Sequence, residues 1–233
     1  MSAPKALLFD VFGTVVDWRG GLIRELIGFG RRRGISADWA DLADAWRAAY
    51  APALGQVLKG EVAWARLEVL QRDSLQEIVI SHRISGLSPA DLDEINLFWR
   101  RGRPWPDSVA GLRRLKKDHV VAALSNGDVA LLVEMARRGK LPWDMIFSTE
   151  LFRSFKPHRS TYLGACAMLG LPPGEVMMCA AHERDLAAAQ ALGLKTAFIA
   201  RPREFGAERA VEPKGNWNHR VGSILELADA LGA

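Results

Sequence analysis

The sequence of 233 residues has only two cysteines, Cys166 and Cys179. So few thiols are typical of a reducing compartment, where a buried cysteine is ordinary core. No apolar run reaches the roughly 18 residues that a membrane-spanning helix needs, so we expect no membrane partner. The first residues also lack a charged segment followed by an apolar one. These absences predict a cytoplasmic protein.

Low-complexity tracts, tandem repeats and a continuous basic stripe are absent as well. The composition, 49% hydrophobic and 25% charged, is that of a globular chain with a real core. Its net charge is +4, and the basic residues form scattered clusters at 31–33, 113–117, 137–138 and 201–203. Each cluster reads as a solvated helix face or loop, without the interleaved aromatic residues of a nucleic-acid groove. No nucleic acid is expected, whereas a mildly positive field suits a small anionic substrate.

The segment from Ala6 to Asp17 reads as a buried strand that delivers one carboxylate to the edge of a sheet. Four apolar residues lead to Asp10, and the chain then passes Gly13 and Thr14 before it turns apolar again. A buried charge is costly unless it has a partner or a function. We therefore take Asp10 as a working group, against the alternative of a structural strand with an incidental aspartate.

Between residues 17 and 99 the apolar residues recur at helical spacing, and the pattern predicts an inserted helical bundle. Ser88 followed by Pro89 is a typical helix start, with serine at the N-cap and proline at the first helical position. The segment 103–106, with two prolines, breaks the helical pattern.

Strand and helix patterns alternate in the rest of the chain, which predicts right-handed βαβ units and a parallel sheet. Ligands bind beyond the carboxyl ends of the strands in such sheets. Polar residues stand just past these ends, so we expect them to converge. The predicted strands are 5–9, 120–124, 145–148, 176–180 and 196–199, and the predicted helices are 107–117, 128–139, 159–169 and a segment that ends near residue 192.

The segment around Asp10 resembles motif I of the haloacid dehalogenase (HAD) superfamily, whose hydrolases use this aspartate as a covalent nucleophile. Phosphatases of the superfamily carry a second aspartate two positions later, and this chain has Phe12 there. An aromatic residue at that position is similar to the type II L-2-haloacid dehalogenase branch. The resemblance includes Thr14 among the catalytic residues and implies that Phe12 lines the substrate pocket.

Two further segments resemble superfamily motifs. Ser125 and Asn126 follow a strand as in motif II, whose hydroxyl holds a substrate oxygen. Lys156 matches the motif III lysine that neutralises the nucleophile, and Tyr162 matches a dehalogenase tyrosine. In the helical segment, Arg47 resembles the dehalogenase arginine, so the resemblance implies that Arg47 and Asn126 receive the halide.

The fourth motif region reads Ala180-Ala181-His182-Glu183-Arg184-Asp185. No carboxylate directly follows the strand, which speaks against a magnesium shell, and a single Cys-x-x-His pair, Cys179 with His182, does not predict zinc. The branch commonly has Ser-x-Asn in place of Ala180-x-His182, and an aromatic residue in place of Arg184. Either Asp185 or His182 is left to activate water.

Taken together, the resemblance implies an α/β fold, a Rossmann-like parallel-sheet HAD core with an inserted helical cap. The predicted core covers residues 1–16 and 101–233, and the predicted cap covers residues 17–100. The implied activity is metal-independent and cofactor-independent hydrolysis of short 2-haloacids through an aspartyl ester. The alternatives are a magnesium-dependent phosphatase of the same superfamily and an inactive binding module. Relatives often pair, so the resemblance also allows a homodimer.

Overall fold

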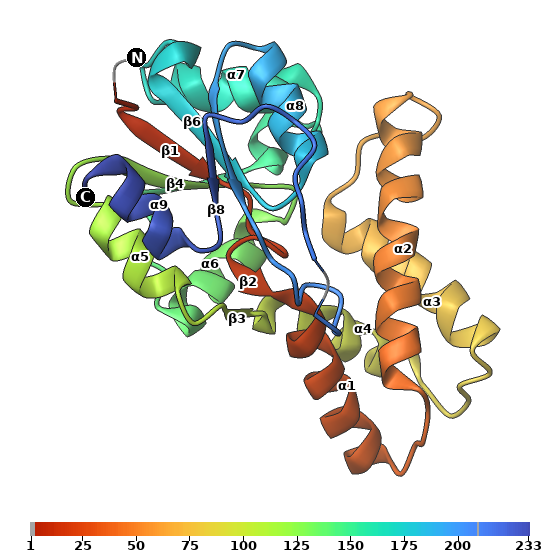
Figure 1. The fold of residues 1–233 in the computed structure, drawn as a ribbon. Coiled ribbons are helices and arrows are strands. Elements are labelled where there is room, and N and C mark those ends of the chain that lie inside the picture. The colour runs from red at the N-terminus through yellow and green to blue at the C-terminus, as the bar shows by residue number, and fades with distance from the viewer. Residues whose placement is uncertain (1–2, 209) are drawn as a thin grey trace.

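The computed structural model describes residues 3–208 and 210–233, which form a sheet flanked by helices and a group of helices beside it (Figure 1). The six strands lie in the order β5-β4-β1-β6-β7-β8, and every neighbouring pair is parallel. The predicted α/β class with a parallel sheet is therefore confirmed. The strands are β1 (Ala6–Phe9), β4 (Val120–Ser125), β5 (Met145–Ser148), β6 (Val176–Ala180), β7 (Lys195–Ile199) and β8 (His219–Val221).

Helices cover both faces of the sheet because successive strand residues point to opposite sides. Leu7 and Phe9 pack in one apolar cluster with α5 (Ser108–Leu115), α6 (Val129–Gly139) and α9 (Ile224–Leu231). Leu8 packs in a second cluster with α7 (Arg159–Met168) and α8 (Glu183–Ala191). Two short 3₁₀ helices, η2 (Thr149–Phe152) and η3 (Pro173–Glu175), complete this part. A central strand buried on both faces explains why the first apolar run is unbroken.

The segment predicted to be a helical bundle is helical. It contains α1 (Trp18–Arg33), α2 (Trp39–Leu58), α3 (Leu67–Ser81), α4 (Pro89–Asn96) and the 3₁₀ helix η1 (Leu97–Arg101). Helix α4 begins as predicted: Ser88 Oγ accepts from the Asp91 N–H, and the Asp91 carboxylate accepts from the Ser88 N–H. This capping box satisfies two N–H groups at the start of the helix.

The chain enters and leaves the helical segment through a two-stranded antiparallel ribbon, β2 (Val16–Asp17) with β3 (Arg103–Pro104). The sequence predicts only a break at β3. Both strands of a two-stranded ribbon are edges, so the missing N–H of Pro104 costs little there. The ribbon brings the two ends of the helical segment together beside Asp10.

Two C-terminal elements are absent from the sequence prediction, the edge strand β8 and the helix α9. The prediction of a solvated loop at residues 201–203 is wrong for Arg201. Its side chain is only 8% exposed and forms two hydrogen bonds with the Asp107 carboxylate, at 2.8 and 2.9 Å. A buried guanidinium in such a pair anchors the segment after β7 to the start of α5.

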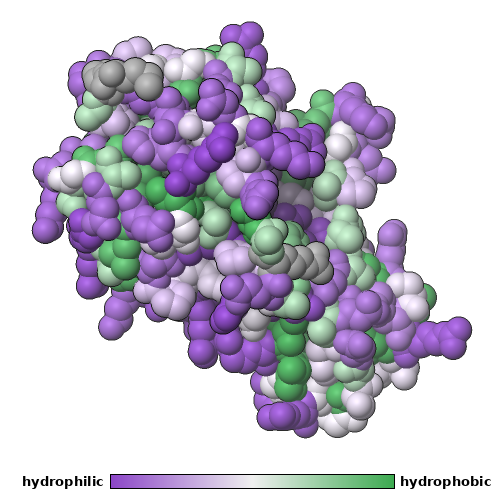
Figure 2. Space-filling view, viewed as in Figure 1, coloured by the Kyte–Doolittle hydropathy of each residue, from purple (hydrophilic) through white to green (hydrophobic). Residues whose placement is uncertain are grey.

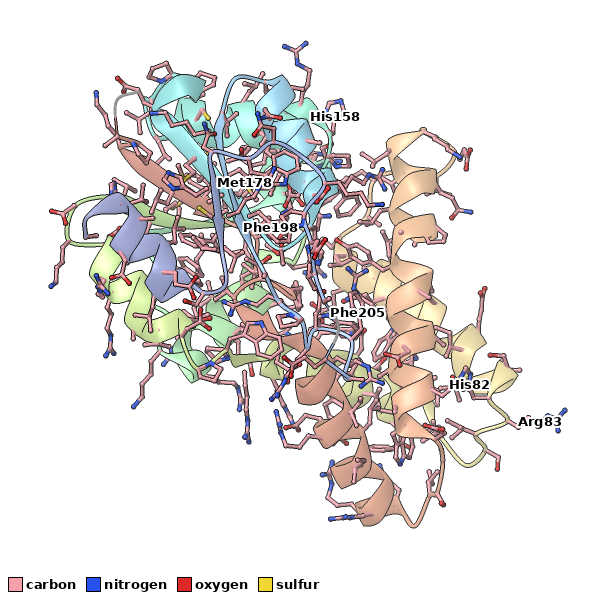
Figure 3. All side chains as sticks on the ribbon, viewed as in Figure 1. His82, Arg83, His158, Met178, Phe198 and Phe205 are labelled. Atoms are coloured by element: carbon pink, nitrogen blue, oxygen red, sulfur yellow. The ribbon has the colours of Figure 1, made fainter. Side chains whose placement is uncertain are left out.

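Figure 2 shows a mainly hydrophilic face that is hollowed between the sheet and the helical segment. Met178 and Phe198 lie within the sheet region, whereas His82 and Arg83 lie at the far end of the helical segment (Figure 3). Within the described residues, none of the helices has the length and apolar character needed to cross a bilayer.

Candidate active site

The carboxyl ends of three neighbouring strands bring the candidate residues together. Asp10 directly follows β1, Ser125 ends β4, and His182 lies two residues beyond β6. The strands are in register there, since Phe9 pairs with Ala123 on one side and with Cys179 on the other. Residues far apart in sequence therefore converge at one edge of the sheet.

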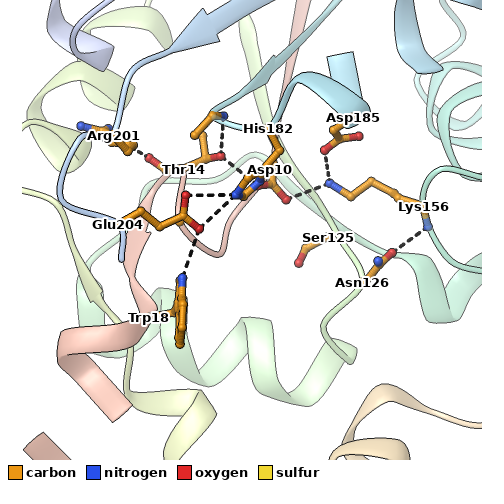
Figure 4. A network of polar contacts seen from close by, with 12 residues as sticks. Asp10, Thr14, Trp18, Ser125, Asn126, Lys156, His182, Asp185, Arg201 and Glu204 are labelled. Atoms are coloured by element: carbon orange, nitrogen blue, oxygen red, sulfur yellow. Dashed lines mark hydrogen bonds and ion pairs between the residues drawn. The ribbon is translucent and has the colours of Figure 1, made fainter. Parts of the chain in front are cut away.

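Asp10 is 7% exposed and accepts hydrogen bonds on both carboxylate oxygens (Figure 4). Lys156 Nζ lies 2.8 Å from Oδ1, while Thr14 Oγ1 at 2.8 Å and His182 Nδ1 at 3.0 Å reach Oδ2. Burial alone would raise the pKa of Asp10, but Lys156 and His182 outweigh it and hold the pKa far below its usual range. The carboxylate is ionised and fixed in orientation.

Lys156 bridges two carboxylates. Its Nζ also lies 2.5 Å from Asp185 Oδ2, and Tyr162 Oη donates to Asp185 Oδ1 at 2.5 Å. Burial would lower the pKa of Lys156, but the charges of Asp10 and Asp185 outweigh it and raise the pKa. The pKa of Asp185 is raised, because burial exceeds the opposing effect of Lys156. The lysine is thus charged between the two acids.

His182 lies between two carboxylates, one of which the sequence does not reveal. Its Nδ1 faces Asp10, and its Nε2 lies 3.0 and 3.1 Å from the two oxygens of Glu204. Burial would lower the pKa of His182, but the hydrogen bonds to Asp10 and Glu204 raise it to about 10. Trp18 is buried, and its Nε1 donates to Glu204 Oε1 at 3.1 Å.

A cavity of about 240 Å³ opens in front of Asp10. Nine of the ten site residues predicted from the sequence line it, and Thr14, behind Asp10, does not. The helical segment supplies the facing wall. The predicted residues at the cavity are Asp10, Phe12, Arg47, Ser125, Asn126, Lys156, Tyr162, His182 and Asp185, and others there include Tyr50, Leu54, Leu67, Trp99 and Arg184.

Arg47 and Asn126 meet at this cavity through Tyr50. The Arg47 guanidinium lies 4.6 Å from the centre of the Tyr50 ring and 5.7 Å from that of Trp18. Asn126 Nδ2 donates to the Tyr50 hydroxyl at 2.7 Å, and its Oδ1 accepts from the Lys156 N–H at 2.8 Å. The Arg47 cation and the Asn126 amide therefore share one side of the pocket, a suitable environment for a small anion.

The donor set in the pocket does not fit a magnesium ion. Magnesium prefers several oxygen ligands in octahedral geometry, whereas Phe12 packs edge-on to Trp99 where a second carboxylate would be needed. In the described part of the chain, no group of three or more His, Cys, Asp or Glu side chains could hold a metal. The Cys179 thiol is buried in β6, and burial raises its pKa, so it is a poor zinc ligand.

The chain is similar to known hydrolases along most of its length. A haloacid dehalogenase-like hydrolase family model matches residues 4–193. Two solved structures superimpose on this chain with a TM-score of 0.95. One is an L-2-haloacid dehalogenase that is 45% identical, and the match covers 99% of both chains. The other is a defluorinating L-2-haloacid dehalogenase that is 40% identical, and the match covers 99% of this chain and 96% of the other. The (S)-2-haloacid dehalogenase of Xanthobacter autotrophicus is 25% identical over 84% of this chain and 75% of its own.

Proposed function

The chain belongs to the haloacid dehalogenase-like hydrolase family, and we propose that it hydrolyses the carbon–halide bond of short 2-haloacids to give 2-hydroxy acids. One observation carries this proposal: the ionised Asp10 faces a small cavity in which Phe12 replaces a second acid and Arg47 stands opposite. The metal-dependent phosphatase alternative is disfavoured, because that chemistry needs an acid for the leaving group and ligands for a metal.

In the first step, an oxygen of Asp10 attacks C2 of the haloacid from the side opposite the halogen. Oδ1 is the better nucleophile because it accepts from Lys156 alone, whereas Oδ2 accepts from both Thr14 and His182. The carbon–halogen bond breaks, and the halide leaves with the electron pair toward Arg47 and Asn126. Covalent catalysis in this form divides one difficult displacement into two easier steps.

In the second step, water attacks Cγ of the aspartyl ester and the Cγ–Oδ1 bond breaks, so that Oδ1 leaves as the hydroxyl oxygen of the product and the oxygen of water stays on Asp10. One proton of water goes to the departing 2-hydroxy acid oxygen and the other is released. We assign Asp185 as the group that orients water and accepts its proton. A histidine with both ring nitrogens protonated has no free lone pair, whereas each oxygen of Asp185 can accept more than one hydrogen bond.

The helical segment would act as the cap of this site. We propose a division into a core of residues 1–16 and 101–233 and a cap of residues 17–100. Support comes from the two-stranded ribbon that joins the parts and from the contacts of Tyr50 and Leu67 with the core residues Asn126 and Asp128. A cap that closes over the pocket would exclude water during the first step.

An isotope experiment tests the covalent mechanism. A single turnover of 2-chloropropionate in heavy-oxygen water, with enzyme in excess, should give an unlabelled 2-hydroxy acid and a labelled Asp10 peptide. The L-haloacid should yield the D-hydroxy acid, since only the first step touches the chiral carbon. Label in the product of the first turnover would refute the nucleophilic role of Asp10. Release of phosphate from an aryl phosphate, without halide release from haloacids, would favour the phosphatase.

We also propose that the protein is a cytoplasmic homodimer. Both cysteines are free and buried, as expected in a reducing compartment. Helix α3 exposes Val69 and Ile80, which a second copy could cover. Light scattering at micromolar concentrations should show twice the 25.7 kDa chain mass, and a monomer throughout would reject the dimer. Cell fractionation should place the protein with cytoplasmic markers.

A further inference from the structure

Neither chemical step uses Glu204, although its carboxylate lies beside His182 at the site. The residue is 4% exposed and belongs to the segment after β7. Its carboxylate accepts from Trp18 Nε1 and lies within 3.1 Å of His182 Nε2. It also lies directly against Gly13, where an added Cβ would come within 2.2 Å of Glu204 Oε1. Gly13 therefore leaves the space that this carboxylate occupies.

The segment that carries Glu204 is anchored on the core side. Arg201 Nε donates to the Thr14 carbonyl at 2.8 Å, and its terminal nitrogens hold the Asp107 carboxylate. Phe205 packs edge-on to Trp18 with ring centres 6.1 Å apart. These contacts fix the backbone on both sides of Glu204, so its carboxylate reaches His182 without a large loss of side-chain freedom.

Glu204 determines the hydrogen-bonding state of His182. A carboxylate oxygen only accepts hydrogen bonds, so a ring nitrogen that faces one must carry a hydrogen. Both ring nitrogens of His182 face carboxylates, Nδ1 that of Asp10 and Nε2 that of Glu204. The ring is therefore an imidazolium that donates from both sides, as its raised pKa of about 10 also indicates. Without the carboxylate at Nε2, this charge would lose one of its two partners.

We infer that Glu204 is a positioning residue that holds His182 as a charged donor to Asp10 Oδ2, so that His182 and Thr14 together stabilise the carbonyl oxygen of the aspartyl ester. This inference rests on the proposed function. Once Oδ1 has bonded to the substrate carbon, Oδ2 is the carbonyl oxygen of the ester. As water adds to Cγ, the electron pair of the C=O bond moves onto Oδ2, and it returns when the Cγ–Oδ1 bond breaks and the 2-hydroxy acid leaves with Oδ1. Two preorganised donors stabilise this charge, as an oxyanion hole does.

A charged donor at Oδ2 affects the two half-reactions differently. The first step consumes the negative charge of Asp10, so a strong donor at Oδ2 slightly disfavours it. The second step creates negative charge on Oδ2, and there the donor is most valuable. Loss of the Glu204 charge should therefore slow hydrolysis of the ester more than its formation. A carboxylate that only tied the loop to the core would affect both steps alike.

Glu204→Gln is the direct test, because the amide keeps the size of the side chain and an acceptor oxygen but removes the charge. In the wild type, the alkaline limb of turnover should lie near pH 10, the pKa of His182. In Glu204→Gln it should move down by about one pH unit or more, since an imidazolium loses stabilisation when a neighbouring carboxylate is neutralised. Glu208→Gln is the matched control, because Glu208 belongs to the same segment and pairs with Arg203 on the surface.

Other charged groups face the same pocket and also influence the pH dependence of turnover. Lys156 and Asp185 lie beyond Asp10, Arg184 belongs to α8, and Arg47 stands across the cavity. All four are unchanged in both variants. A shift that appears in Glu204→Gln and not in Glu208→Gln is therefore assigned to His182.

A quenched-flow measurement with 2-chloropropionate supplies the second readout. At pH 9, Glu204→Gln should release about one halide per site in a burst and then turn over about tenfold more slowly than the wild type. Mass spectrometry should find Asp10 esterified in the variant. If the alkaline limb of Glu204→Gln stayed at the wild-type position and no ester accumulated, the inference about Glu204 would be overturned. Halide release in the same experiment would still support the proposed function.

Nitrogen-15 NMR of histidine-labelled wild-type protein keeps the test decisive if Glu204→Gln does not fold. The His182 signals, assigned with His182→Asn, should show a proton on both ring nitrogens at pH 8. A neutral His182 ring at that pH would overturn the inference in the native enzyme. A wild type that released no halide from any haloacid would instead reject the proposed function, and the NMR titration would still report on Glu204.

Discussion

Arg47 is a cation held by aromatic rings. Its guanidinium lies over Tyr50 and Trp18, and no ion pair joins it to a carboxylate within residues 3–208 and 210–233. Stacking fixes the plane of the guanidinium and leaves the N–H groups at its edge for an anion. This geometry distinguishes Arg47 from the surface arginines of the helical segment, such as Arg72, which pairs with Asp93.

Replacement of Arg47 tests halide capture. Arg47→Lys keeps the charge but loses the planar set of donors, so we expect turnover to fall more than about tenfold, or about 1.4 kcal/mol of barrier. Arg31→Lys, on an exposed turn of α1, is the control and should match the wild type. Steady-state halide release measures both variants. Wild-type turnover in Arg47→Ala would assign the residue to packing alone.

The residues that the sequence reveals share one property. Asp10, Ser125 and His182 lie at or within two residues of the ends of buried strands, so the periodicity locates them before any contact is known. Glu204 lacks this signal, because it lies in a polar segment with no periodic pattern. Its partners His182 and Trp18 are 22 and 186 residues away. Contacts at such separations form only when three elements pack together. No local pattern in the sequence indicates that packing.

At the scale of elements, helix α3 begins against the start of α6. Its N-cap residue, Arg66, makes no capping hydrogen bond with its side chain. Asp128, at the start of α6, instead accepts from the Leu67 N–H at 3.0 Å and the Glu68 N–H at 2.8 Å. Burial, at only 1% exposure, raises the pKa of Asp128. A side chain outside the helical segment thus supplies the cap that α3 lacks.

Asp128→Ala should lower both the stability of the fold and the turnover of the enzyme. Loss of an N-cap costs about 1 to 2 kcal/mol, and for a chain of this size we expect the Tm to fall by about 2 to 8 °C. Because Leu67 lines the pocket, turnover should also fall at least about threefold. Calorimetry and halide release measure the two effects.

The control for that variant is Asp38→Ala. Asp38 caps α2 from within the helical segment, at an exposed position. Asp38→Ala should lower the Tm by about as much as Asp128→Ala does and leave turnover unchanged. Equal turnover in the two variants would show that the Asp128 contact has no role at the site.

Element boundaries follow the strength of the local signal. Strands β5 and β6 agree with the predicted ranges, because β6 is an uninterrupted apolar run and β5 is a shorter apolar run that ends at Ser148. Strand β8 has only three residues, none of them buried, so it carries no apolar pattern. It forms because β7 leaves an open edge that can pair with it. The ribbon of β2 and β3 likewise depends on the two ends of the helical segment meeting.

At the scale of the whole molecule, the charges of the site nearly balance before substrate binds. Asp10, Asp185 and Glu204 are opposed by Lys156, His182, Arg47 and Arg184. An incoming carboxylate therefore meets no net negative potential, and the chain as a whole carries +4. The counter-charge that a phosphatase obtains from a metal ion is here supplied by side chains.

This balance predicts that catalysis proceeds without a divalent cation. Lys156 Nζ already lies between Asp10 and Asp185, at 2.8 and 2.5 Å, so a cation at that position would meet an ammonium group at close range. We expect the rate of halide release from chloroacetate to stay within about 10% of its starting value in excess chelator and to stay unchanged when magnesium is restored. A metal-dependent phosphatase in the same buffer is the control and should lose its activity. If halide release stopped in chelator and returned with magnesium, a metal would have to displace Lys156 from the two carboxylates. The proposed mechanism would then be wrong at its first step, because the charge that orients Asp10 would not be the lysine.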